Sequence, residues 1–205
     1  MAPTPVYLEI GSKKVFACAV DWPGWCRSGK TEDVALEALA AYGARYAVVP
    51  AEAGVRFAKT AKSSFVAVER VEGSSTTDFG APGAVPRLDE EPLTAGEAAR
   101  AAKLLDASWA VFDRVVKNAP ASLRKGPRGG GRDRDKMIAH VVAAEEGYAR
   151  KLGVRPHDRD AILDAVSTSA GKTLLLDKGW PPRYAVRRMA WHVLDHAWEI
   201  EDRSE

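Results

Sequence analysis

Ala190-Trp191-His192-Val193-Leu194-Asp195-His196 is the stretch that decides how the C-terminal half of this chain is interpreted. If the stretch is helical, both histidines fall within an apolar stripe that repeats every three or four residues: Ala185, Met189, His192, Val193, His196 and Ile200. Their four-residue separation brings the Cβ atoms within about 5–6 Å, so both rings can bind one metal ion. Residue 193 is valine, so this is not the HExxH motif of zinc proteases.

The chain has four histidines, and His140 is the candidate third ligand. It flanks the apolar stripe of a predicted helix, so packing that helix against the last one brings three imidazoles together. Three neutral nitrogens with open positions are typical of a catalytic site for zinc, nickel or iron(II). The alternative is that these are hydrogen-bonded core histidines. His157 lies in the turn Arg155-Pro156-His157-Asp158 and is expected to be an exposed loop residue.

Composition places the chain among globular proteins. Its 205 residues are 46% hydrophobic and 28% charged, with a net charge of +2. We therefore expect neither a nucleic-acid partner nor a membrane partner, because there is no strongly basic face and no apolar run of about 18 residues. The absence of a signal-like N-terminus favours a cytoplasmic location, where Cys18 and Cys26 are expected to be free thiols.

The pattern of residues changes near residue 72. We predict an α+β domain over residues 1–72, with strands at 6–10, 14–20 and 65–71 and a helix over 31–46 that has Thr31 as its N-cap. Residues 73–91 are rich in glycine and proline and are predicted to be a linker. Residues 92–205 predict an all-α four-helix bundle with helices near 94–116, 133–152, 158–169 and 182–202, the first opened by the capping box Thr94-Ala95-Gly96-Glu97.

Residues 24–31 match the phosphate-binding pattern GxxxxGK[ST] letter for letter. We do not interpret them as a nucleotide site, because none of the later strands ends in an acidic residue suited to magnesium. The same region, Asp21-Trp22-Pro23-Gly24-Trp25 followed by Gly29-Lys30-Thr31-Glu32, resembles the HicB-like antitoxin fold over about residues 5–72. That resemblance implies a β-β-α-β unit. HicB proteins normally add a DNA-binding segment, whose place a helical region takes here.

Residues 135–145 together with residues 190–196 resemble the DinB-like superfamily, and the resemblance spans about residues 92–203. It implies a four-helix bundle that holds a metal through one histidine of the second helix and an HxxxH pair of a later helix, here His140, His192 and His196. Members include thiol S-transferases and isomerases that use mycothiol or bacillithiol. The metal lowers the pKa of a bound thiol, and water in the same position would give hydrolysis.

The glycine-rich loop 124–134 precedes the His140 helix and carries several bases. We expect Arg128 or Arg132 to pair with a carboxylate of the cosubstrate, and the alternative is a solvated connector. Glu145 and Asp195 are the acids nearest to the histidines in sequence, and we expect supporting or surface roles for them rather than catalysis.

Trp191 and Trp198 fall on the side of the last helix away from the histidines. They are predicted to pack on another helix, on the N-terminal domain, or on a second copy in a homodimer.

The predicted function is a metal-dependent thiol S-transferase or hydrolase that uses a low-molecular-weight thiol or acts on a small electrophile. The alternative is a non-enzymatic interaction or stress-response protein, in which the HicB-like domain binds a protein partner and the bundle is a scaffold.

Overall fold

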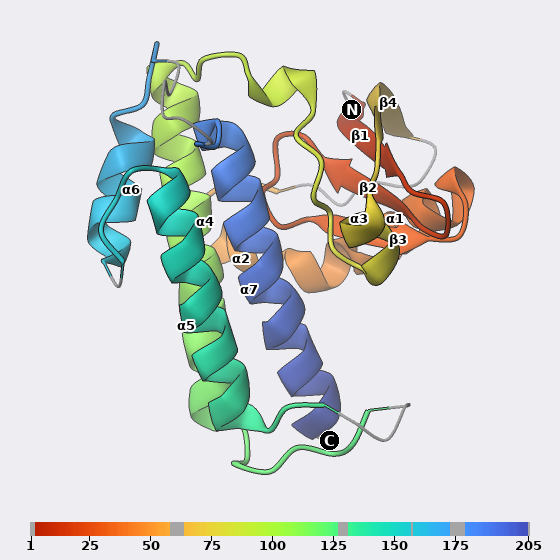
Figure 1. Cartoon of the computed structure of the whole chain (residues 1–205), viewed down its shortest axis with the longest axis vertical. Helices are drawn as coiled ribbons and strands as arrows, with labels where there is room; N and C mark the ends of the chain where they lie inside the picture. The colour runs from red at the N-terminus through yellow and green to blue at the C-terminus, as the bar shows by residue number, and fades with distance from the viewer. Residues whose placement is uncertain (1–2, 58–63, 127–130, 157, 173–178, 205) are drawn as a thin grey trace.

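The computed structural model describes residues 3–57, 64–126, 131–156, 158–172 and 179–204. Within these residues, a mixed four-stranded sheet with helices forms the N-terminal half, and several packed helices form the C-terminal half (Figure 1). The elements in chain order are β1 (Thr4–Ile10), β2 (Val15–Ala19), β3 (Cys26–Gly29), α1 (Glu32–Tyr46), α2 (Val48–Glu52), β4 (Phe65–Glu72), α3 (Ser75–Phe79), the 3-10 helix η2 (Arg87–Asp89), α4 (Ala95–Asn118), α5 (Arg134–Lys151), α6 (Arg159–Ser167) and α7 (Pro182–Ser204).

The sheet has the strand order β3-β2-β1-β4. β2 is antiparallel to both of its neighbours, whereas β1 and β4 are parallel and are therefore joined by a crossover that contains α1. The predicted α+β class is confirmed. β3 is an additional strand that was not predicted, because it has only four residues and lies within the glycine-containing stretch 24–31.

Gly24 and Gly29 of the stretch 24–31 allow the backbone to lie close against two helices, where a side chain would not fit. Gly24 has a φ of 88°, and a Cβ placed there would lie 2.6 Å from Leu194 Cδ1 in α7. A Cβ at Gly29 would lie 2.5 Å from the Ala35 amide nitrogen in α1. The stretch thus forms a turn and a strand pressed against two helices, which explains its glycines without a phosphate ligand.

The predicted helix starts are confirmed. Thr31 Oγ1 accepts a hydrogen bond from the Val34 amide (3.3 Å), and Thr94 and Glu97 form the capping box of α4. In the helical half, α4 and α5 both pack against α7, and α6 packs against α4. This arrangement places two faces of α7 in contact with other parts of the chain (Figure 1).

The segment 73–91, predicted as a linker, carries α3 and η2 and is held by buried polar groups. Glu9 of β1 is fully buried and accepts hydrogen bonds from the Thr77 hydroxyl and from the amides of Gly83 (2.9 Å) and Ala84 (3.1 Å). Such contacts leave no periodic pattern in a sequence, so only the turn-rich composition of this segment was visible beforehand.

Trp191 and Trp198 are buried against the N-terminal half, which confirms one of the three predicted alternatives. The Trp191 ring meets Phe16 of β2 edge to face, with ring centroids 6.2 Å apart, and the Trp198 ring meets Tyr42 of α1 at 5.3 Å. One cluster of buried side chains runs from β1 through α4, α5 and α7. The two halves therefore share a hydrophobic core.

Cys18 and Cys26 are free, buried thiols on directly opposite positions of β2 and β3, with their sulfur atoms 2.7 Å apart. Burial raises the pKa of the Cys26 thiol well above its ordinary value, so it stays protonated and unreactive at neutral pH.

Among the described residues, no helix combines the length and apolar character needed to cross a bilayer.

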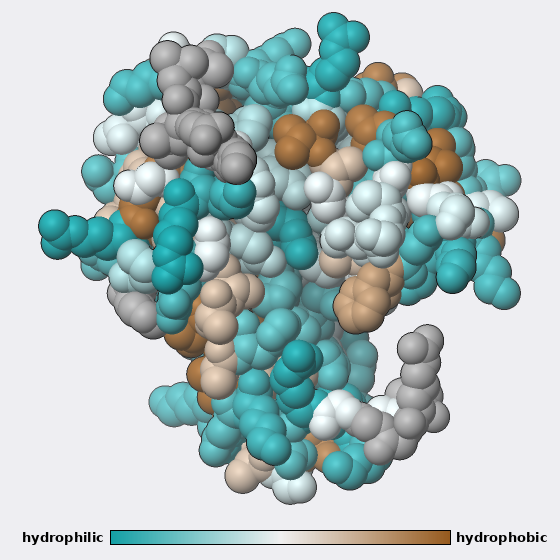
Figure 2. Space-filling view, in the orientation of Figure 1, coloured by the Kyte–Doolittle hydropathy of each residue, from teal (hydrophilic) through white to brown (hydrophobic). Residues whose placement is uncertain are grey.

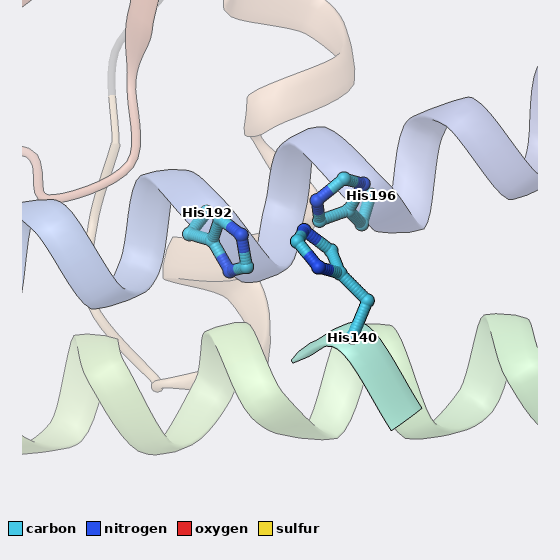
Figure 3. A group of neighbouring side chains, drawn as sticks. All are labelled: His140, His192 and His196. Atoms are coloured by element: carbon cyan, nitrogen blue, oxygen red, sulfur yellow. The ribbon is translucent and has the colours of Figure 1, made fainter. Parts of the chain in front are cut away.

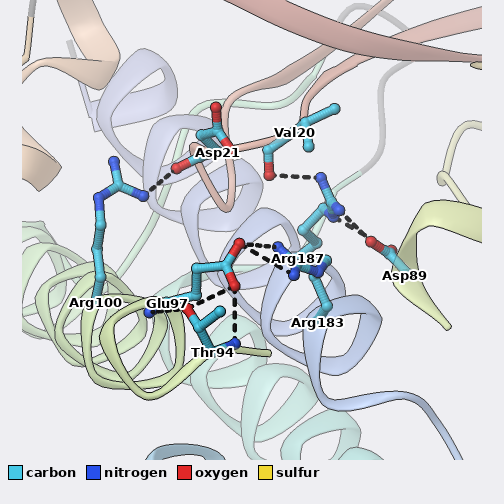
Figure 4. Close-up of polar contacts among 8 residues, drawn as sticks. All are labelled: Val20, Asp21, Asp89, Thr94, Glu97, Arg100, Arg183 and Arg187. Carbon is cyan, nitrogen blue, oxygen red and sulfur yellow. Dashed lines mark hydrogen bonds and ion pairs between the residues drawn. The ribbon is translucent and has the colours of Figure 1, made fainter. Parts of the chain in front are cut away.

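A buried ion pair fastens α7 to the segment before α4. The Arg187 guanidinium donates to both carboxylate oxygens of Asp89 and to the carbonyl oxygen of Val20 (2.6 Å), and both ionic side chains are almost completely buried (Figure 4). Next to it, Arg183 of α7 pairs with Glu97 of α4 at 3.2 Å. These contacts join α7 to three separate parts of the chain.

We predict that Arg187→Met destabilises the fold by about 3–5 kcal/mol, because it leaves the Asp89 carboxylate buried without its counter-ion. Urea unfolding followed by circular dichroism measures the change. Arg150→Met is the matched control: its partner Glu146 lies on the surface of α5, and its loss should cost less than about 1 kcal/mol. Equal midpoints for the two variants would contradict the prediction.

Candidate metal centre

The three predicted ligands converge between α5 and α7. His192 and His196 lie one turn apart on α7, and His140 of α5 faces them (Figure 3). Their ring centroids are 5.2 Å apart for His140 and His192, 4.9 Å for His140 and His196, and 4.6 Å for His192 and His196. The residues therefore form one cluster, in which each ring contributes one candidate donor atom and all of these atoms lie within 4.8 Å of one another.

The spacing of the donor atoms fits a metal ion after a small adjustment. Nitrogen ligands of a tetrahedral zinc ion lie about 2.0–2.1 Å from the metal and hence about 3.4 Å from each other. Each side chain has two rotatable bonds, so rotations of the imidazoles can close the remaining gap. Among the described residues, no fourth histidine, cysteine or acid joins the group, so this part of the chain supplies three donors.

Burial keeps the rings of His192 and His140 in the neutral form that binds metals. His192 is only 7% exposed, and this burial, followed by repulsion from His196, lowers its pKa to about 2. Burial and the neighbouring His196 also lower the pKa of His140. Both imidazoles are therefore uncharged at neutral pH, and their lone pairs are available without the loss of a proton.

Glu199 orients the third ring. Its Oε2 lies 3.2 Å from Nδ1 of His196. Because a carboxylate accepts and does not donate, this ring nitrogen carries the proton and leaves Nε2 for an ion. Glu199 Oε1 in turn accepts a hydrogen bond from Arg203 (2.9 Å). The hydrogen bond with His196 lowers the pKa of Glu199. This residue was not predicted, although its position three residues after His196 was a usable signal.

The two acids considered in the sequence have other partners. Glu145 forms an ion pair with Arg159 of α6 at 3.1 Å, and Asp195 forms one with Arg27 of β3 at 3.0 Å. The first joins α5 to α6, and the second joins α7 to the sheet. Their contacts agree with the supporting role that we expected for them.

Arg132 lies on the N-terminal side of α5 with an exposed side chain, and its carbonyl oxygen accepts a hydrogen bond from Arg203 (2.8 Å). Its charge contributes to lowering the pKa of both His140 and His192, which places it within electrostatic reach of the cluster. Arg128 and His157 lie outside the described residues.

Comparison with known proteins adds no relative: no family model, no curated protein and no solved structure matches this chain. The N-terminal sheet and the helical region with its three-histidine cluster are consistent with the DinB-like resemblance without establishing membership.

We predict that the chelator-treated protein binds about one zinc ion per chain, and that His192→Ala weakens zinc binding by more than about 100-fold because it removes one of three donors. Competition with a chromophoric chelator and elemental analysis after gel filtration measure affinity and stoichiometry. Asp135→Ala, which removes an exposed acid near the start of α5 that is not part of the cluster, is the control. Identical zinc contents of wild type and His192→Ala would exclude this site.

Glu199→Gln should weaken zinc binding by about 10-fold, because an amide holds the His196 ring less firmly than a carboxylate does. The same competition assay measures it. Glu146→Gln changes an acid of α5 that pairs with the exposed Arg150 and should leave the affinity unchanged. A similar loss in both variants would show that general charge, and not the contact to His196, controls binding.

Proposed function

We propose that the helical half is a metal-dependent thiol S-transferase or hydrolase that acts on a small electrophile. A single observation supports this proposal: three imidazoles from two helices place one donor atom each within 4.8 Å of one another, and the described residues add no further donor. A closed structural zinc site uses four protein ligands, whereas a catalytic site keeps one position for water or substrate. The donor set suits zinc, nickel or iron(II).

A divalent ion bound here would lower the pKa of a thiol or a water molecule bound beside it. The protein's own contribution is to hold the three donors. His192 and His196 are fixed by the burial of α7, and His196 is further fixed by Glu199. Tyr148 of α5 packs edge to face on His192 with ring centroids 5.7 Å apart, which limits the access of water from that side.

In the transferase reaction, the thiol proton passes to solvent and the sulfur forms a bond to the electrophilic carbon. The leaving group departs with its bonding electron pair. With water in place of the thiol, the same sequence gives hydrolysis. A low-molecular-weight thiol is thus the expected cosubstrate, and Arg128 or Arg132 is proposed to pair with a carboxylate of this cosubstrate.

A second candidate function rests on the sheet edge. β4 is an edge strand on which Val66 and Val68 are exposed on the same face, and Figure 2 shows hydrophobic residues gathered over the N-terminal half. An apolar edge of this type suits a protein partner, which would make the bundle a scaffold.

Loading the protein with cobalt(II) separates the two functions. In the enzyme, we expect adding a thiol to produce a sulfur-to-cobalt absorption band, and we expect metal-dependent conjugation of the thiol to chlorodinitrobenzene or metal-dependent hydrolysis of nitrophenyl acetate. Both signals should disappear in His192→Ala. A cobalt-loaded protein whose spectrum does not respond to thiols, and which turns over neither substrate, would favour the scaffold.

A further inference from the structure

Arg188 lies beside the metal centre. It precedes His192 by four residues on α7 and therefore lies on the same side of the helix, one turn away. Its guanidinium carbon is 4.7 Å from the ring centre of Trp191 and 5.5 Å from that of Tyr148. Because Tyr148 also packs on His192, the same aromatic ring contacts both the arginine and a candidate metal ligand.

Among the residues that the structure describes, Arg188 is the arginine of α7 without an acidic partner. Arg183, Arg187 and Arg203 each pair with a carboxylate, on Glu97, Asp89 and Glu199 respectively. For Arg188, the described part of the chain offers neither an ion pair nor a hydrogen bond to the buried Nη1 atom. A buried, charged donor without an acceptor is costly, so this position is suited to an acceptor that arrives with a ligand.

The charge around the cluster favours an anion. Imidazole ligands carry no negative charge, so a divalent ion among them keeps its full positive charge. The nearest carboxylate, Glu199, is already paired with Arg203. Two cationic side chains belong to the same region: Arg188 packs on the Tyr148 ring that also contacts His192, and Arg132 lies at the N-terminal side of α5, the helix that carries His140. The surroundings are thus cationic, and a neutral ligand would leave this charge uncompensated.

We infer that Arg188 binds the carboxylate next to the thiol of a small thiol acid whose sulfur occupies the open position of the metal centre. Arg128 or Arg132 would then pair with a carboxylate farther from the sulfur. This inference rests on the proposed function and deepens it, because it names an anionic thiol as the ligand. Four residues of helix span about 6 Å along the axis, which matches the reach of a metal-bound sulfur plus a short carboxylate arm. The planar guanidinium can donate two parallel hydrogen bonds to a carboxylate, and the rings of Tyr148 and Trp191 hold it in place.

The test compares mercaptoacetate with mercaptoethanol, which carry the same thiol but a carboxylate or a hydroxyl group. Titration of the cobalt(II) protein, followed by the sulfur-to-cobalt band, gives an affinity for each. We expect wild type to bind mercaptoacetate about 10-fold more tightly, as for a charge-assisted hydrogen-bonded pair. Arg188→Gln should bring the ratio near one with an unchanged cobalt affinity, and Arg150→Gln, an exposed arginine of α5, should keep the wild-type ratio.

The outcomes separate the two proposals. Failure to bind cobalt overturns the proposed function and the role of Arg188 with it. Cobalt binding with equal affinities for the two thiols in wild type, or a preference that survives in Arg188→Gln, overturns the role of Arg188 alone. If Arg188→Gln does not fold, Arg188→Lys replaces it. Lysine keeps the charge but not the planar fork, so we expect it to retain a weaker preference. An unchanged ratio in Arg188→Lys would contradict the bidentate contact.

Discussion

The burial of α7 on two sides is the constraint on which the rest of the structure depends. A helix with apolar residues on one side only can lie on a core and face water with the other. α7 instead buries Met189, Val193 and Ile200 toward the helical half and Trp191 and Trp198 toward the N-terminal half. Both faces must therefore be covered, and the two halves of the chain cover them by packing on opposite sides of α7 around one hydrophobic core.

Burying a helix in this way also forces its polar residues to find partners. Arg187 pairs with Asp89, and Arg203 pairs with Glu199, because a charge without a partner is expensive away from water. The same environment makes His192 a neutral imidazole. One physical cause, desolvation along α7, thus gives the fold its specific ion pairs and keeps the His192 imidazole uncharged.

The placement of the cluster on two long helices explains how it can be held rigidly. His192 directly follows Trp191, whose ring is fixed against Phe16 of the sheet. The N-terminal half consequently helps to set the position and rotation of α7, and through α7 the positions of His192 and His196. This gives a structural reason for joining the two halves in one chain, because the sheet acts as a support for the helix that carries two of the three donors.

What the sequence determined by itself was local. Periodic apolar residues and caps identified the long helices, and the spacing of His192 and His196 placed both on one face, since these patterns depend only on residues a few positions apart. The tertiary structure decided the rest: the approach of His140, the pairing of Asp89 with Arg187, the contact of Glu199 with His196, and which face of α7 the sheet covers. Most of these contacts join residues far apart in the chain. The contact of Glu199 with His196 is the exception, because the two residues lie three positions apart on α7. The long-range contacts form between whole elements. Their partners are chosen by the packing of whole elements, which no local pattern encodes.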